Sequence, residues 1–488
     1  MSARRRFAWN AFFVAALSFS SSAILRGQAP AATGGAATAQ AAPSTEALVV
    51  EIQRLQQAIE ALQTQLAESR REAADVQHSL QVLRDQLDEE RDLLAGQLST
   101  LEQAKVESGS KYRVRLFGMA LMQLISTRGA VDNIDLPNLA LESPPGDSGG
   151  NISAAVRQSY IGLAVFGPRV GGLTTSGDLR LDFFHGFPAA NDGLSAPGVR
   201  MRTMQIAFDG TRTSVRAGQE APFFSPLSPT SLASTAYPGL ATSGNIWAWT
   251  PQVYVERRIA QPNDTTVSIR AGVLDSLTGE LPAGEYSRLA TAGERSRVPA
   301  SAVRVGVRHA ADERVTSAGV GAYYARQNWG YGRTVDAWAT TADWELPLSA
   351  GLQISGEAYA GRAIGGLGGG AHSSVLFDGV PDVASSTVFP LNSRGGWAQL
   401  KLKANARTEL NAAYGFDHSR PRGFTGLLQV PNDATPSASR NASDMFNVIY
   451  QVRSNVFLSV EYRRLWTTRF DGRSWLADHL NLAGGIVF

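Results

Sequence analysis

Cysteine is absent from this 488-residue chain, and lysine occurs only at Lys105, Lys111, Lys401 and Lys403. Without a thiol the chain forms no disulfide, binds no metal through thiolates and has no cysteine nucleophile. The missing lipobox cysteine argues against a lipoprotein. After residue 25 no run of about 20 apolar residues follows, which argues against an inner-membrane helical protein.

The N-terminal residues have the composition of an export signal. Arginines at positions 4 to 6 precede an apolar stretch from residue 7 to residue 25, and a tract rich in Ala, Gly and Thr follows. This order is typical of a secretory signal peptide. We expect residues 1–39 to be that signal, cleaved after Ala29 or after Ala39, and residues 40–47 to be a linker. A membrane anchor is the alternative, although Asn10 and several serines interrupt the apolar run.

Between residues 48 and 104 the apolar residues return at steps of four and three. They are Leu48, Ile52, Leu55, Ile59, Leu62, Leu66, Ala73, Val76, Leu80, Leu83, Leu87, Leu94 and Leu101. Sustained heptads predict an α-helical coiled coil. At about 1.5 Å per residue, a helix of this length suits a periplasmic stalk. A single amphipathic helix lying on the following domain is the alternative.

From residue 111 onward the heptad pattern gives way to strict alternation. In the segment 176–184, Leu179, Leu181 and Phe183 face one way and charged residues face the other. About 16 such segments, joined by connections rich in Gly, Pro, Asn and Asp, predict an all-β transmembrane barrel over residues 111–488. A barrel of that size is wide enough for an aqueous channel. A soluble β-sandwich also alternates and is the alternative.

The last strand favours the barrel. Leu480, Leu482, Ile486 and the terminal Phe488 alternate with polar or small residues. An aromatic ending of this kind resembles the signal read by the outer-membrane barrel assembly machinery, which is therefore an expected partner through Phe488. We expect the protein in the bacterial outer membrane, with its coiled coil in the periplasm.

Several stretches together resemble one family of porins. They are RQSYIGLAVFGP from Arg157, GDLRLDF from Gly177, RAGQEAPFFSPLSPTSL from Arg216, GGWAQLKLK from Gly395 and SVEYRRLWTTRF from Ser459. With the coiled coil and the terminal aromatic residue, their order resembles the DcaP-like, dicarboxylate-type trimeric porins. The resemblance implies a homotrimer and an inward-folded constriction loop over residues 221–247. The sequence departs from the family's usual aromatic residue after Gly-Gln, because Glu220 and Ala221 stand there.

The residues of this segment agree with a loop. Pro222, Pro226, Pro229 and Pro238 remove backbone donors, so the segment cannot be a central strand. An ordinary extracellular loop is the alternative to a constriction.

Arginine is the strongest chemical signal in the barrel, because guanidinium keeps its charge and binds carboxylate or phosphate bidentately. We predict that these arginines and acids line the pore or bind solute: Arg113, Arg115, Arg157, Arg180, Arg200, Arg202, Arg216, Arg257, Arg270, Arg463, Asp178, Asp182, Glu220 and Glu357. Arg304 and Arg308 also fall on expected inward positions. For any single arginine, a structural ion pair in the wall is the alternative.

Signals for catalysis are weak. Gly146 to Gly150 reads GDSGG, as around the nucleophile of trypsin-like proteases, but the only upstream histidine, His78, lies in the predicted coiled coil. The histidines lack metal-ligand spacing, and the run from Gly365 to Gly370 lacks the context of a phosphate loop. We therefore predict no enzyme, no metal and no cofactor, with a phospholipase as the formal alternative.

The sequence thus predicts a porin for passive diffusion of small hydrophilic, anionic solutes of the carboxylate type. Its expected partners are outer-membrane lipid, two further copies of the chain and peptidoglycan reached through the stalk, and no nucleic acid. Leucine and isoleucine at the heptad seam would by themselves favour two strands rather than three. The alternative function is a structural envelope protein, tethering the outer membrane through its coiled coil.

Overall fold

The computed structural model describes residues 112–186, 197–280, 288–311, 314–421 and 438–488, with individual residues between Val49 and Arg84. The chain divides into two compact units, Met1–Leu83 and Arg84–Phe488. In the first unit the described residues are helical, and the coiled coil itself stays a prediction. The predicted signal peptide and linker lie outside the described residues. Among the helices that are described, none is both long and apolar enough to cross a membrane.

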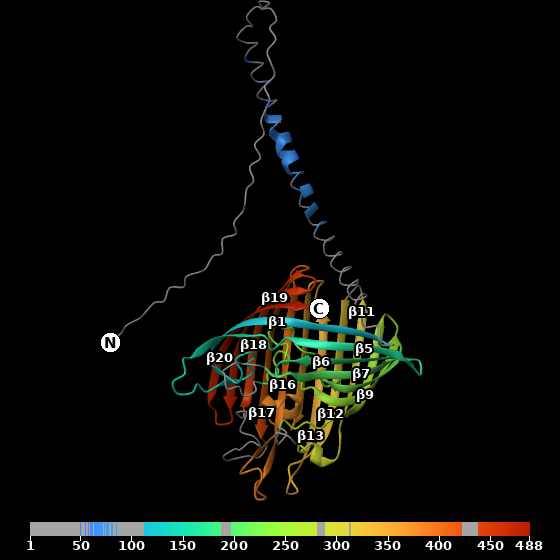
Figure 1. Ribbon diagram of the computed structural model, residues 1–488, viewed down its shortest axis with the longest axis vertical. Coiled ribbons are helices and arrows are strands. Elements are labelled where there is room, and N and C mark those ends of the chain that lie inside the picture. The colour runs from blue at the N-terminus through green and yellow to red at the C-terminus, as the bar shows by residue number, and fades with distance from the viewer. Residues whose placement is uncertain are drawn as a thin grey trace, which may run out of the picture. The chain divides into compact units, whose positions relative to one another are not determined.

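The second unit is a closed antiparallel β-barrel (Figure 1). Its wall has 16 strands when β4 and β5 are taken as one. They are β1 (Arg113–Arg128), β4 (Gly150–Ala155) continued by β5 (Tyr160–Val170), β6 (Leu173–Asp182), β7 (Arg200–Asp209), β8 (Thr213–Glu220), β9 (Thr250–Gln261), β10 (Thr265–Leu274), β11 (Ala300–Ala311), β12 (Arg314–Asn328), β13 (Thr334–Pro347), β14 (Leu352–Arg362), β16 (Val388–Lys403), β17 (Thr408–Pro421), β18 (Ala438–Arg453), β19 (Val456–Arg469) and β20 (Ser474–Val487).

The first and last strands seal the wall. β1 pairs with β20 over the register from Met119 with Val487 to Arg128 with Asp478, and on its other side with β4 and β5. The backbone N–H of Gly118 donates to the terminal carbonyl of Phe488 at 2.9 Å. Because neighbouring strands pair antiparallel throughout, the predicted barrel of about 16 strands is confirmed.

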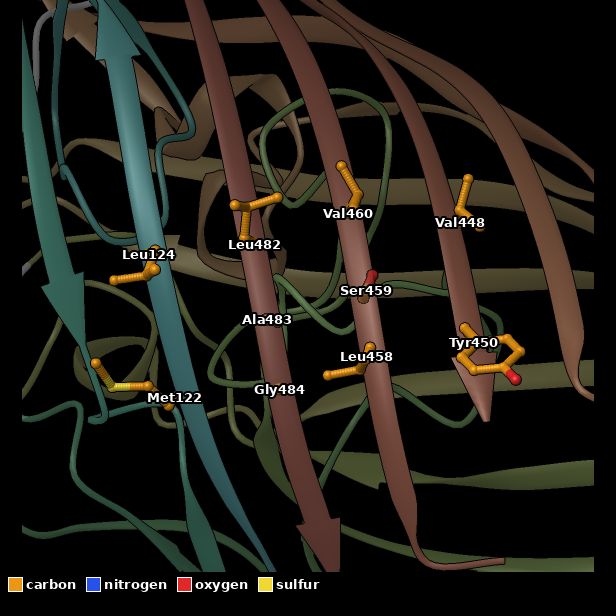
Figure 2. A pocket seen from close by; sticks show the side chains of 10 residues that line it. All are labelled: Met122, Leu124, Val448, Tyr450, Leu458, Ser459, Val460, Leu482, Ala483 and Gly484. Carbon is orange, nitrogen blue, oxygen red and sulfur yellow. The ribbon is translucent and has the colours of Figure 1, made fainter. Parts of the chain in front are cut away.

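Alternation decides which side chains meet lipid. In β1, Met122 and Leu124 are exposed on the outer face, whereas Gln123 and Thr127 are buried on the inner face. The outer faces of β1, β18, β19 and β20 enclose an apolar hollow of about 400 Å³ beside Gly484 (Figure 2). An apolar outer face and a polar inner face are the pattern of a membrane-spanning barrel.

The two ends of the barrel differ. Connections at the end that holds the C-terminus are tight, such as Gly171–Gly172, which adopts the positive φ of a two-residue hairpin. Connections at the opposite end are long, and outer-membrane barrels direct such loops to the cell exterior. Three of them carry small elements: β2 (Ala130–Val131) with β3 (Ala140–Leu141), η1 (Glu294–Ser296), and η2 (Gly365–Leu367) with η3 (Gly370–His372) and β15 (Val375–Phe377).

Candidate functional site in the barrel lumen

The segment between β8 and β9, residues 221–249, runs inside the wall, and we call it the inner segment. Its start is fixed to β9, because the N–H of Phe223 donates to Oε1 of Gln252 at 3.1 Å. Nε2 of Gln252 in turn donates to the carbonyl of Ala221 at 2.7 Å. The prolines of the segment have no backbone N–H to donate. Many of its other backbone N–H and C=O groups form hydrogen bonds with side chains of the wall.

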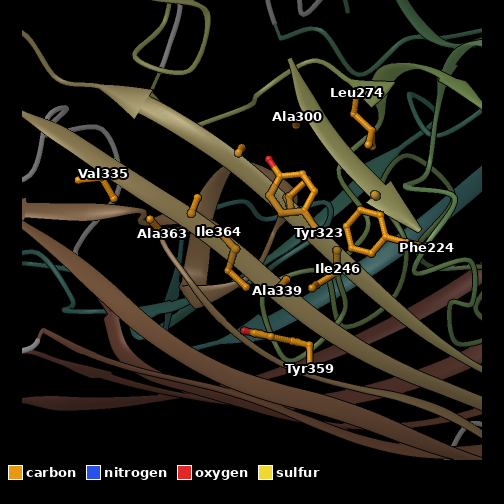
Figure 3. Close-up of a cluster of buried hydrophobic side chains, with 14 of the residues drawn as sticks. Phe224, Ile246, Leu274, Ala300, Tyr323, Val335, Ala339, Tyr359, Ala363 and Ile364 are labelled. Atoms are coloured by element: carbon orange, nitrogen blue, oxygen red, sulfur yellow. The ribbon is translucent and has the colours of Figure 1, made fainter. Parts of the chain in front are cut away.

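The inner segment next meets β13 and β14. The carboxylate of Glu357, which is almost fully buried, accepts the hydroxyl of Ser225 at 2.8 Å and the N–H of Leu227 at 2.7 Å. Immediately before Ser225 the chain places Phe224 in an apolar cluster, where its ring stacks on Tyr323 with centroids 5.4 Å apart (Figure 3). A polar anchor and an apolar anchor therefore lie side by side.

On the far side of the lumen the inner segment is held by β16, β18 and β19. The N–H of Thr230 donates to Gln399 at 3.0 Å, and its carbonyl accepts from Asn447 at 3.0 Å. Ser231 donates to Glu461, while Arg463, paired with Glu461 at 2.6 Å, contacts Ser234. Hydrogen bonds on opposite parts of the wall show that the segment crosses the barrel.

The segment then reaches β5 to β7. Oε1 of Gln158 accepts the N–H groups of Thr235 and Ala236 at 2.9 and 3.2 Å. Arg200 donates to the hydroxyl of Tyr237 at 2.7 Å and holds the fully buried Asp182 with two bonds of 3.0 and 2.7 Å. This bidentate pair places a charged anchor at the bend of the segment.

Two further inward pieces pack against the inner segment. The N–H groups of Trp247 and Ala248 donate to the carbonyl of Leu367 in η2 at 3.1 and 3.2 Å. The ring of His372 lies edge-on to Trp247, and burial lowers the pKa of this imidazole to about 4. The glycine run of residues 365–370 thus fills space inside the barrel.

The third inward piece is the β2–β3 hairpin. Asp132 accepts the N–H groups of Asn138 and Leu139 at 2.9 Å each, and burial raises the pKa of this carboxyl to about 6. Asp135 in the same turn pairs with Arg157, whose guanidinium also lies 4.0 Å from the ring centre of Phe184. Arg157 is therefore a buried structural residue beside the lumen.

Strand register places nearly all of the predicted site residues on the inner face. Those on the inner face are Arg113, Arg115, Arg180, Arg200, Arg202, Arg216, Arg270, Arg463, Asp178, Asp182, Glu220 and Glu357, together with Arg304 and Arg308. Arg257 is a correction, because it alternates with the exposed Val253 and Val255 on the outer face of β9 and donates to Thr213 there. Its neighbour Arg258 is the inward residue, paired with Glu256 at 2.6 Å.

Two groups can be distinguished among the inward arginines. Arg157, Arg200, Arg304 and Arg463 are closely paired with carboxylates, and Arg304 binds Asp343 at 2.9 and 2.6 Å. In these four the structural alternative that the sequence left open holds. Glu461 and Glu357 are likewise engaged by the inner segment or by arginine.

The second group comes from β1, β6 and β7 and lies over aromatic rings of β1, β5 and the inner segment. Arg113 lies 5.3 Å from the centre of Phe166. Arg115 and Arg180 lie 5.7 and 5.4 Å from that of Phe117. Such cation–π contacts orient guanidinium without neutralising its charge.

Arg202 extends this group toward the inner segment. Its guanidinium lies 5.7 Å from the ring centre of Tyr160 and 5.1 Å from that of Trp249. A β-bulge between Arg180 and Leu181 lets Arg202 reach the inner face beside Arg200. We call Arg113, Arg115, Arg180 and Arg202 the open arginines. Within the described ranges, their shortest ion pair is Arg180 with Asp178 at 3.8 Å.

Charges of both signs border the open arginines. Arg216 lies 3.4 Å from Asp209 and donates to Gln205 at 3.0 Å, and Gln205 donates in turn to Glu220. Arg270 pairs with Glu256 at 2.9 Å. Trp249 and Glu256 were not predicted, since a tryptophan after a loop and an acid within an alternating strand give no separate signal in the sequence.

The residues with weak catalytic signals make local contacts. The hydroxyl of Ser148 donates to the carbonyl of Gly150 at 2.8 Å in an exposed turn. No group of three or more His, Asp or Glu side chains in the described part of the chain is placed to hold a metal ion. What the lumen offers is a set of guanidinium groups suited to transient contact with anions.

Comparison with known proteins supports the fold. No family model and no curated protein matches the sequence. The barrel is similar to the crystal structure of the outer membrane channel DcaP of Acinetobacter baumannii, with 16% identity and a TM-score of 0.57 over 78% of this chain and 99% of that one. An anion-selective porin from Comamonas acidovorans shares 9% identity over 78% of this chain and 100% of its own, with a TM-score of 0.45. The predicted resemblance to DcaP-like porins is therefore confirmed at the level of fold.

Proposed function

We propose that this chain, which has the fold of an outer-membrane channel, is a porin through which small hydrophilic solutes diffuse passively. We further propose that the pore prefers anions, carboxylates in particular. The observation that carries the proposal is the difference between the two groups of inward charges. Buried carboxylates such as Asp182 and Glu461 are occupied by arginine or by the inner segment, whereas the open arginines keep their charge over aromatic rings.

The surplus of positive charge that the open arginines carry into the lumen should make the pore selective for anions. A narrow aqueous passage between low-dielectric walls concentrates the field of its charges, so a modest cationic surplus attracts anions and repels cations. Several weak contacts along β1, β6 and β7 suit transport, because a solute must be attracted without being retained. The carboxylate preference follows the resemblance to dicarboxylate-type porins and the fit between carboxylate and guanidinium.

The test is the reversal potential of the reconstituted channel in a salt gradient. We expect anion preference in the parent protein and a shift toward cations in Arg180→Ser/Arg202→Ser. Arg257→Ser is the matched control, because it removes an exposed arginine from the outer face of β9. Cation preference in the parent would contradict the proposal, and equal shifts in both variants would remove the open arginines from the filter.

We also propose that three barrels associate and that their N-terminal heptads form a parallel stalk in the periplasm. The resemblance of the sequence to trimeric porins supports the trimer, and helical residues between Val49 and Gln81 agree with a stalk. Mass measurement of the detergent-extracted protein tests both points. If deletion of residues 48–104 converts the trimer to monomers, the stalk is required for trimer assembly. A parent protein that is only monomeric would refute the trimer.

A further inference from the structure

The outer face of the wall carries a cluster of three arginines and one histidine at the end with the long loops. Arg394 on β16, His418 on β17 and Arg440 on β18 occupy one row of paired residues, and Arg420 follows on β17 two positions further. We call these four residues the outer cationic cluster. Residues directly opposite on neighbouring strands lie about 5 Å apart between Cβ atoms, so the cluster is compact.

Alternation fixes the direction of these side chains. Asn441 and Asp417 next to them are buried on the inner face, which turns Arg440 and His418 outward. Arg394, Arg420 and Arg440 are exposed. His418 accepts a hydrogen bond from Nε of Arg420 at 3.2 Å, and this bond orients the guanidinium.

The outward residues of β17 change character along the strand. Leu410 and Ala412 come first, then Tyr414 and Phe416, whose rings stack with centroids 6.3 Å apart. The polar His418 and the cationic Arg420 end the series. This order matches hydrocarbon, membrane interface and headgroup in succession, because aromatic residues gather at interfaces and arginines reach toward headgroups. The cluster thus lies just beyond the apolar belt.

The cluster keeps its charge. Among the residues that the structure describes, no ion pair involves Arg394, Arg420 or Arg440, whereas two other outward arginines, Arg326 and Arg464, pair with aspartates at 3.0 and 2.7 Å. Asp444, the outward carboxylate four residues from Arg440 on β18, is opposite Arg464 in the register. Three guanidinium groups without a carboxylate partner among the described residues are suited to binding a polyvalent anion.

We propose that the outer cationic cluster binds the phosphate groups of a lipid in the outer leaflet, with its acyl chains against Tyr414 and Phe416. The anion must sit at the edge of the lipid-facing belt, where a permeating solute does not pass. The residues paired with Phe416 on the two neighbouring strands, Gly396 and Ala442, are small, so its ring is not flanked by bulky outward side chains in that row. In the outer membrane, the lipid of that leaflet that carries several phosphates is lipopolysaccharide, and we commit to its lipid A portion as the occupant.

The inference requires the barrel to span the outer membrane but is independent of pore selectivity. Its test uses the full-length protein, purified in detergent and delipidated, and measures bound lipid A by native mass spectrometry. The test variant is Arg394→Gln/Arg440→Gln. The matched control is Arg257→Gln/Arg314→Gln, which removes two exposed arginines at the tight-turn end. We expect lipid A to bind the test variant about 30-fold more weakly than the parent and the control about as well as the parent.

Three further measurements separate the possible sources of binding. Lipid A lacking its phosphates should bind the parent as weakly as phosphorylated lipid A binds the test variant. Inorganic phosphate at millimolar concentration should compete poorly, because it lacks acyl chains. Arg394→Lys/Arg440→Lys retains the charge and should recover most of the affinity. Equal binding of lipid A to the parent and the test variant, equal loss in the control, or equal binding of the phosphate-free lipid would each overturn the proposal.

A binding failure caused by misfolding is recognised independently. The test variant must migrate as the folded barrel on an unheated gel and must show the conductance of the parent. A folded and conducting variant that no longer binds lipid A supports the proposal. If the variant misfolds, Arg420→Gln, which removes one exposed arginine of the cluster, provides the same comparison, and unchanged lipid A affinity in Arg420→Gln then overturns the proposal.

Discussion

The carboxylate of Glu357 on β14 accepts the backbone N–H of Leu227, a residue 130 positions away in the chain, at 2.7 Å. The same carboxylate accepts the hydroxyl of Ser225. A side chain of the rigid wall thus fixes the backbone of the segment that crosses the lumen. Because Glu357 and Ser225 are buried and Leu227 is partly buried, solvent does not readily replace this acceptor, and the position of the inner segment depends on it.

Removal of this acceptor should loosen the inner segment. In Glu357→Ala, the N–H of Leu227 and the hydroxyl of Ser225 lose their hydrogen-bond acceptor, which costs about 1 to 3 kcal/mol of local stability. We expect larger current noise in single-channel recordings and faster proteolysis within residues 221–249. Glu409→Ala is the control, because Glu409 faces inward but pairs with Lys401 at 3.5 Å away from the inner segment. Equal noise in both variants would contradict this role of Glu357.

Two inward arginines should differ in how much they contribute to the stability of the fold. Arg200→Ser leaves Asp182 buried without its partner, and breaking a buried pair costs about 3 to 5 kcal/mol. Arg216 is one-third exposed and lies 3.4 Å from Asp209, so Arg216→Ser should cost less than about 1 kcal/mol. Denaturant unfolding should show a large shift only for Arg200→Ser. The idea fails if the two midpoints move together.

A glycine pair tests how closely the inner segment approaches the wall. A Cβ atom at Gly244, where φ is +92°, would lie 2.2 Å from the carbonyl oxygen of Gly396 on β16. Gly146 has a similar φ of +86° but open space around it, so Gly146→Ala meets only the backbone penalty of about 1 kcal/mol. We expect Gly244→Ala, and not Gly146→Ala, to change single-channel conductance. Identical conductance in both variants would place the segment further from the wall.

Acid should weaken the packing around His372. Burial lowers the pKa of this imidazole to about 4, below its ordinary value near 6.5, so the unfolded chain binds the proton more readily. Stability supplied by neutral His372 is therefore present at pH 7 and is lost as the pH falls from about 6.5 toward 4. Asp132 opposes this trend, because its raised pKa favours the folded form on acidification.

The measurement for His372 is single-channel noise between pH 7 and pH 4.5. We expect noise to rise on acidification in the parent and to change less in His372→Asn, which cannot take up the proton. An unchanged pH dependence in the variant would assign the effect to other groups.

The barrel could be predicted from the sequence because alternation is a local property. Each strand carries its own pattern of lipid-facing and inward residues, as Leu179, Leu181 and their charged neighbours show. The error at Arg257 has the same origin. Arg257 and Arg258 are consecutive, so a phase that is wrong by one residue moves the inward charge to the outer face.

The lumen could be predicted only in part. Prolines indicated that residues 221–247 do not form a strand, but the anchors Gln158, Gln399 and Asn447 come from distant strands and carry no local sign of their role. Nor does the sequence mark which arginines have buried partners. Arg157 and Arg180 look alike in an alternating pattern, and only the β2–β3 hairpin brings Asp135 to the first.

The pairing of β1 with β20, which closes the barrel, carries the largest loop-closure entropy cost of the strand pairings. Wall strands that the structure describes pair with their sequence neighbours, except that β1 pairs with β20, where Thr127 is opposite His479 at a separation of 352 residues. Hairpins can therefore form one after another at low loop-closure cost. The backbone N–H and C=O groups along the free edges of β1 and β20 stay unpaired until the two ends of the sheet meet. Until then each edge strand is open to pairing with another chain. Aggregation during refolding should accordingly depend on protein concentration, and it should fall when the ends of the sheet are held close together.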